Sequence, residues 1–131
     1  MKKIVILERS HEFRELLKLQ FNLLDFPVAV IDVHDSEQIV SYLASREYDY
    51  AIIELEDLNP LFREKPHLLK AISTATKIIF ITTGLTALLK LTMVSRRMEI
   101  YDKFTEFESV LQCLNRHTLP VFADNSLTKP N

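Results

Sequence analysis

Short apolar runs that alternate with helical repeats constrain the fold of this chain more than any other feature. The runs are rich in Ile, Val and Phe, are apolar at consecutive positions and are too short for buried helices. They span residues 3–7, 28–33, 50–55, 77–82 and 98–102, of which the last is the weakest. Between them, apolar residues recur every three or four positions, as on one face of a helix. This alternation predicts a parallel sheet with helices on both faces.

Capping signals mark the expected helix starts. Ser10 can cap the first helix, and Asp35 with Gln38 matches a capping box before the second. Thr105 with Glu108 matches another capping box, which predicts that the last helix starts there. The remaining expected segments are a polar loop at 56–66 and helices at about 67–74 and 85–97.

Composition places the chain among globular domains. It has 131 residues, of which 47% are hydrophobic and 26% charged, and this fits one compact core. We expect one domain over residues 1–118 and a flexible C-terminal tail or linker remnant over residues 119–131. The formal net charge of −2 gives no strong attraction to nucleic acid or to an anionic membrane.

Several classes of protein are disfavoured. No apolar run approaches the roughly 20 residues that span a bilayer, and Met1 leads straight into the first strand without a signal-peptide pattern. A single cysteine, Cys113, cannot form an internal disulfide, so we expect the cytoplasm, with Cys113 as a small core residue. A single glycine, Gly84, argues against a P-loop or a dinucleotide fold, in which the backbone must approach phosphate closely.

The candidate site lies at the carboxyl ends of the predicted strands. Right-handed crossovers place those ends along one edge of a parallel sheet, and ligands of such sheets bind there. The polar residues at this edge are Glu8, Arg9, Glu54, Thr82 and Lys103. None of the histidines shows metal-ligand spacing with another histidine or with the cysteine, so we expect no zinc site.

Four stretches resemble the receiver domains of two-component response regulators: KIVILERSHEFRELLK, REYDYAIIELED, KIIFITTG and DKF. The resemblance runs from Lys3 to about Arg116. It implies a single doubly wound, flavodoxin-like α/β domain with a parallel five-stranded sheet in the order 2-1-3-4-5. It aligns Glu54 with the phosphoacceptor aspartate and the pair Glu8 and Arg9 with the two acidic residues that help to hold Mg²⁺. Thr82 and Lys103 align with the hydroxyl and the lysine that bind phosphoryl oxygens.

The departures from the family pattern predict a degenerate receiver. Arg9 puts a permanent cation where a metal ligand is expected, and Glu54 is one methylene longer than the aspartate it replaces. We therefore expect no Mg²⁺, no phosphorylation and no enzymatic activity, but a pseudo-receiver that signals by protein contact. Two alternatives stay open: a Mg²⁺-dependent receiver that is phosphorylated at Glu54 or Asp57, and a sensor that binds a small ligand in the vacated pocket.

An ion network is expected to replace the lost chemistry. The Glu54 carboxylate could reach Lys103, Arg9 or Thr82, and Arg9 could pair with Glu54 or Glu8. Glu54 is then either a partial mimic of a phosphoryl group or a strand-end carboxylate tolerated after phosphorylation was lost. The nearby acidic loop residues could hold a cation, but solvation is favoured: Glu56, Asp57 and Glu64.

The readout of the family is expected to be altered as well. The aromatic switch residue of the family aligns with Ile100, and Tyr101 follows one position later. Either the switch is lost or the strand carries a one-residue slip, which would reverse the face of each side chain. Lys90, Arg96 and Arg97 form a basic stretch that is either solvated or an interaction surface. We expect a protein partner, or a second copy bound through the face of the fourth helix, fifth strand and last helix, and neither nucleic acid nor membrane.

Overall fold

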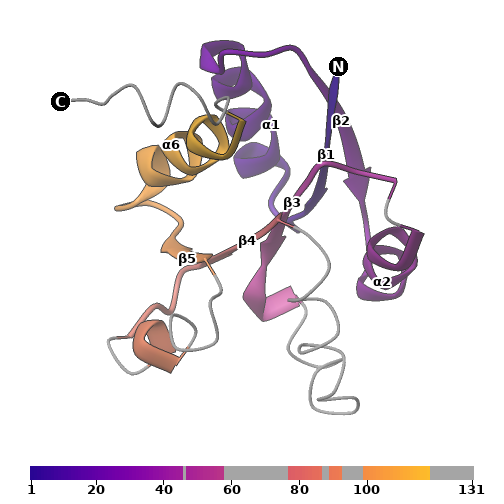
Figure 1. The fold of residues 1–131 in the computed structure, drawn as a ribbon. Helices are drawn as coiled ribbons and strands as arrows, with labels where there is room; N and C mark the ends of the chain where they lie inside the picture. The colour runs from indigo at the N-terminus through magenta and orange to yellow at the C-terminus, as the bar shows by residue number, and fades with distance from the viewer. Residues whose placement is uncertain (46, 58–76, 87–88, 93–98, 119–131) are drawn as a thin grey trace, which may run out of the picture.

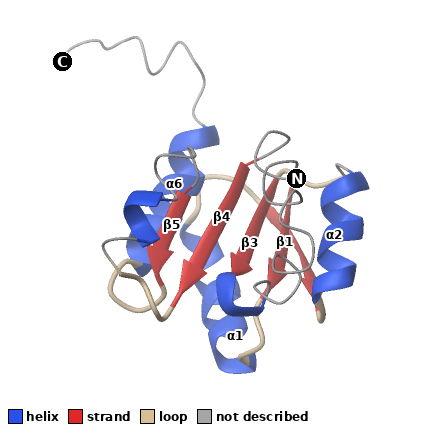
Figure 2. Cartoon of the chain, turned by 90° about the horizontal axis from the view of Figure 1, so that it is seen from below, coloured by secondary structure: helices blue, strands red, loops and turns tan. Residues whose placement is uncertain are grey.

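The computed structural model describes residues 1–45, 47–57, 77–86, 89–92 and 99–118. Its sheet has five strands, all parallel, in the order β2-β1-β3-β4-β5. The strands are β1 (Lys2–Leu7), β2 (Val28–Val33), β3 (Tyr50–Glu54), β4 (Lys77–Thr82) and β5 (Glu99–Asp102). The arrowheads in Figure 2 all point to one edge of the sheet. The predicted flavodoxin-like α/β fold and its strand order are confirmed.

Helices cover both faces of the sheet. The helices are α1 (His11–Gln20), followed by the 3₁₀ turn η1 (Phe21–Leu23), α2 (Ser36–Ser45) and α6 (Phe107–Thr118). Residues 55–57 and 89–92 are also helical. Figure 1 shows α1 and α6 together on one side of the sheet and α2 on the other. The expected helices at 67–74 and over most of 85–97 lie outside the described residues, as does the tail at 119–131.

The central strands are buried on both sides, which explains why their sequences are apolar at consecutive positions. Ile4 and Ile6 of β1 pack with residues of α1 and α6, whereas Val5 and Leu7 pack with residues of α2. Cys113 of α6 is fully buried, as expected for a small core residue.

The register of the sheet aligns the strand ends. Leu7 of β1 lies opposite Ile53 of β3, and Thr82 of β4 lies opposite Asp102 of β5. The residues that follow these positions therefore meet at one edge, as the right-handed crossovers of a parallel sheet require.

Two of the predicted helix caps are present. The Ser10 hydroxyl accepts a hydrogen bond from the Phe13 N–H at 3.2 Å. The Asp35 carboxylate accepts one from the Gln38 N–H at 2.8 Å. The Gln38 side chain accepts from the His34 N–H at 3.0 Å, one residue earlier than in a standard capping box.

Two local expectations are wrong. α6 starts at Phe107, so Thr105 does not cap it. Instead the Asp102 carboxylate accepts hydrogen bonds from the N–H groups of Phe104 and Thr105, at 3.0 and 2.9 Å, and Glu106 accepts one from the Asp102 N–H at 3.0 Å. The Asp102 carboxylate at the end of β5 thus accepts the hydrogen bonds from the N–H groups of the turn that precedes α6. Residues 55–57 are helical although a loop was expected from residue 56.

Candidate functional site

Buried polar side chains gather at the carboxyl edge of the sheet. In the described part of the chain, the buried polar and charged residues are Glu8, Glu54, Thr82 and Lys103, each at most 8% exposed. Each one ends or directly follows a strand, and each was selected from the sequence. Burial of charged groups is costly unless they are paired, so their mutual contacts decide what this edge can do.

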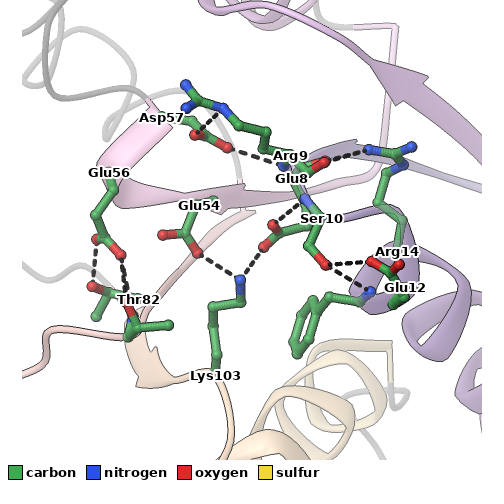
Figure 3. A network of polar contacts seen from close by, with 12 residues as sticks. Glu8, Arg9, Ser10, Glu12, Arg14, Glu54, Glu56, Asp57, Thr82 and Lys103 are labelled. Atoms are coloured by element: carbon green, nitrogen blue, oxygen red, sulfur yellow. Dashed lines mark hydrogen bonds and ion pairs between the residues drawn. The ribbon is translucent and has the colours of Figure 1, made fainter.

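Lys103 is the central cation of this cluster. Its Nζ lies 2.7 Å from Glu8 Oε1 and 3.4 Å from Glu54 Oε2, and Figure 3 shows it between the two carboxyl groups. The ammonium also lies 4.5 Å from the centroid of the Phe13 ring. The Lys103 N–H donates to the Thr82 carbonyl at 3.0 Å, which ties the start of the β5–α6 loop to the end of β4. The expected contact between Glu54 and Lys103 is therefore present.

The turn after β1 holds Glu8 in place. Glu8 Oε2 accepts a hydrogen bond from the Ser10 N–H at 2.8 Å. The Arg14 guanidinium on α1 donates to the Glu8 carbonyl oxygen at 2.6 Å. The carboxylate is thus fixed from its own turn and points its other oxygen at Lys103.

Arg9 points away from the buried cluster. Its Nε lies 3.2 Å from Asp57 Oδ1, its N–H donates to Asp57 Oδ2 at 3.1 Å, and its side chain is 84% exposed. The expected pairing of Arg9 with Glu54 or Glu8 is wrong, and so is the expected solvation of Asp57. Glu8 points inward, so the next residue points outward, where the helical turn at 55–57 presents Asp57 (Figure 3).

Glu56 is the partner of Thr82, a contact that the sequence did not reveal. The Thr82 hydroxyl donates to Glu56 Oε2, and the Thr83 N–H and hydroxyl donate to Glu56 Oε1 at 3.1 and 3.2 Å. Glu56 is an exposed residue, but its carboxylate is not merely solvated, contrary to expectation. The expected contact of Thr82 with Glu54 is replaced by this one. In the sequence, the only indication of this contact was that Glu56 follows Glu54 by two residues. The direction of the Glu56 side chain depends on the helical turn at 55–57.

The protonation of the cluster follows from these contacts. Burial, a hydrogen bond to Glu56 and the nearby carboxylates raise the pKa of Glu54 to about 9, against the effect of Lys103. Burial alone would lower the pKa of Lys103, but the hydrogen bond to Glu8 and the nearby acidic charges raise it. Partial burial would raise the pKa of Glu56, yet the hydrogen bonds from Glu54, Thr82 and Thr83 lower it. Near neutral pH the cluster therefore holds a protonated Glu54, an anionic Glu56 and a cationic Lys103.

Comparison with known proteins supports the fold. No protein-family model matches the sequence, and no curated protein matches it. A solved structure described as a response regulator from Hahella chejuensis is similar, with a TM-score of 0.69 and 13% sequence identity over 92% of this chain and 97% of that chain. The chain has a receiver-like fold. At this identity the likeness shows the fold and nothing finer.

Ile100 and Tyr101, the two positions considered for a switch residue, lie on opposite faces of β5. Ile100 is 2% exposed and packs in the core that contains Leu85 and Leu89, on the side of α2. Tyr101 packs on the side of α1 and α6, and its hydroxyl donates to Glu99 at 2.6 Å. The aligned switch position is thus filled by an aliphatic residue, and the aromatic ring faces the opposite layer.

Of the basic stretch formed by Lys90, Arg96 and Arg97, only Lys90 lies among the described residues. Lys90 Nζ lies 2.8 Å from Glu106 Oε2, so this ammonium is held in an ion pair. Arg96 and Arg97 lie outside the described residues. Among the described residues, no helix is long and apolar enough to cross a membrane.

Two of the carboxyl groups at this edge already lie beside a cation of the protein, Lys103. A Mg²⁺ site of the receiver type needs several oxygen ligands that face one point. Glu8 is paired with Lys103, burial raises the pKa of Glu54 to about 9, and Arg9 is paired with Asp57. In the ranges that the structure describes, no group of three or more His, Cys, Asp or Glu side chains is placed to hold a metal.

Two hollows flank the cluster. A shallow groove of about 370 Å³ opens over the carboxyl groups of Glu8 and Glu54 and is also bordered by Thr83. A second hollow of about 480 Å³ lies between the ends of β1 and β2, beside Arg9 and Arg14. Solvent and small solutes can therefore reach the rim of the cluster.

Proposed function

We propose that this chain is a pseudo-receiver that acts in signal transduction through protein contacts, without phosphorylation and without enzymatic activity. A receiver-like fold and a response-regulator neighbour support a signalling role. Thr82 and Lys103 match the hydroxyl and the lysine of the receiver family, but Glu54 stands at the position of the phosphoacceptor aspartate.

The observation that carries this proposal is the position of the Lys103 ammonium between Glu8 and Glu54. A divalent cation at this edge would have to displace an internal cation that is already paired at 2.7 Å. Without the metal, the charge that develops on a transferred phosphoryl group is neutralised less well, because the remaining cation, Lys103, is already paired with Glu8. A protonated Glu54 is also a poor nucleophile, since only the ionised carboxylate attacks readily.

The proposed contact surface is the face formed by residues 89–92, β5 and α6, through which the chain would bind a protein partner or a second copy. Two large apolar side chains near this face are exposed, Leu91 at 68% and Phe104 at 69%, as Leu19 and Leu23 are on another part of the surface. Large apolar side chains at the surface can form the apolar centre of an interface when they cluster. The Lys90–Glu106 ion pair fixes one part of this face. Sedimentation of the wild type and of Leu91→Asp tests the self-association: a dimer that the substitution leaves unchanged would contradict this surface.

Phosphorylation is tested directly. The protein is incubated with acetyl phosphate and Mg²⁺, and its intact mass is measured beside a phosphorylatable receiver as a positive control. We expect no mass increase. A phosphoryl adduct at Glu54 or Asp57 would overturn the proposal.

The matched variant carries Arg9→Asp and Glu54→Asp together, which rebuilds the acidic set of the family. We expect it to gain measurable Mg²⁺ affinity by calorimetry, whereas the wild type shows none. Equal Mg²⁺ affinity of the two proteins would contradict the idea that these two replacements removed the metal.

A further inference from the structure

The corner that follows β4 presents its hydrogen-bond donors to one carboxylate. The donors are the hydroxyls of Thr82 and Thr83 and the Thr83 N–H, and all of them donate to Glu56. The Thr82 oxygen also accepts a hydrogen bond from the Gly84 N–H at 3.1 Å, so this hydroxyl both donates and accepts. Converging backbone and hydroxyl donors of this kind are the usual ligands of an oxyanion.

Glu54 does not accept these hydrogen bonds, although it is the residue that aligns with the phosphoacceptor aspartate. Its Oε2 lies 3.4 Å from Lys103 Nζ, and the donors of the corner go to Glu56 instead. The anion at the corner is thus two residues farther along the chain, on the helical turn at 55–57. This arrangement separates the two tasks of the site: Lys103 is neutralised mainly by Glu8, and the corner is filled by Glu56.

We propose that the Thr82–Thr83 corner is an oxyanion-binding site that Glu56 occupies permanently as a built-in ligand. The tethered carboxylate would hold the corner in a single conformation. An interaction partner would then always bind this one conformation. The inference rests on the proposed function in one respect, because it takes this corner as a part of the domain that a partner reads.

Tethering explains why Glu56 prevails over free anions. An internal ligand acts at an effective concentration in the millimolar range or above, without loss of translational freedom on binding. A free phosphate or carboxylate must compete with it. Because Glu56 is exposed and Thr83 borders an open groove, a small anion could enter the corner once the carboxylate is removed.

The test is chemical rescue of the variant Glu56→Ala by added anions. The rescue is monitored through the backbone amide signals of Thr83 and Gly84 in NMR spectra. We expect these signals to shift in the variant, and the amide hydrogens to exchange with solvent at least ten times faster. Inorganic phosphate should return the signals toward their wild-type positions with a dissociation constant on the order of millimolar. Acetate tests a carboxylate at the same ionic strength, and chloride tests a general salt effect.

Glu54→Gln is the matched control, since it removes the neighbouring carboxylate and leaves Glu56 in place. We expect near wild-type Thr83 signals and no response to phosphate. Glu56→Gln, which conserves the side-chain shape, guards against misfolding and should show a smaller shift than Glu56→Ala. The proposal is overturned if Glu56→Ala does not respond to phosphate or acetate beyond the effect of chloride, or if the wild type responds equally.

These outcomes are independent of the phosphorylation test. The rescue uses neither a phosphodonor nor Mg²⁺, so a covalent adduct on the wild type would overturn the proposed function and leave the rescue unaffected. Conversely, a failed rescue without a phosphoryl adduct would overturn only the proposal that Glu56 is a built-in ligand.

Discussion

Replacement of Glu54 by glutamine should make the protein more stable at neutral and alkaline pH. In the native state, burial and the hydrogen bond to Glu56 keep the Glu54 carboxyl protonated, with a pKa of about 9 against an ordinary value of 4.5. The amide introduced by Glu54→Gln would supply a permanent N–H donor to Glu56 and an oxygen toward Lys103. The substitution therefore keeps the contacts and removes the ionisation.

The size of the effect follows from proton linkage. Between pH 4.5 and about 9, the native protein holds a proton that the unfolded chain has released. The free energy of unfolding then falls as the pH rises, by at most about 1.4 kcal/mol per pH unit. The limit between pH 6 and pH 8 is about 3 kcal/mol, and we expect about 1 to 2 kcal/mol because water in the groove screens the charge. Below pH 4.5 this group contributes no pH dependence.

The assay is urea denaturation of the wild type and the variant at several pH values from 5 to 8.5. The difference between the two free energies of unfolding cancels the other titrating groups. It should rise steadily with pH in favour of the variant. Glu47→Gln, which changes an exposed glutamate, is the control and should give a flat difference. A flat difference for Glu54→Gln as well would refute the protonated state of Glu54.

Three further substitutions test the other contacts. Lys103→Met leaves the buried Glu8 without its cation and should lower the free energy of unfolding by about 3 kcal/mol in urea denaturation; a loss below about 1 kcal/mol would mean that Lys103 is not the counterion. Ser10→Ala removes the α1 cap and should cost about 1 kcal/mol in the same assay, whereas Ser10→Asp should retain most of the stability. Ile100→Tyr forces a larger ring into a closed core and should lower the melting temperature, at a cost of about 1 to 3 kcal/mol; an unchanged or higher melting temperature would show that the site still accepts an aromatic residue.

The sequence by itself determined the parallel sheet and the edge at which its polar residues meet, whereas the strand order was implied by the family resemblance. Continuous apolar runs such as the one in β1 are buried on both faces in any parallel sheet, whatever the details of packing. The handedness of the crossovers then brings Glu8, Glu54, Thr82 and Lys103 to one edge, because chain chirality acts in the same way in every such fold. The structure brings these residues to one edge for that reason.

Only the tertiary structure decided which charged groups meet. Arg9 was expected inside the cluster, yet it pairs with Asp57, and Thr82 was expected near Glu54, yet it donates to Glu56. Both contacts are made from the helical turn at 55–57, which was expected to be a loop from residue 56. The charge of Glu54 is decided in the same way. A carboxyl group carries its ordinary charge in a sequence, but in a folded protein its charge depends on burial and on which neighbours share its proton.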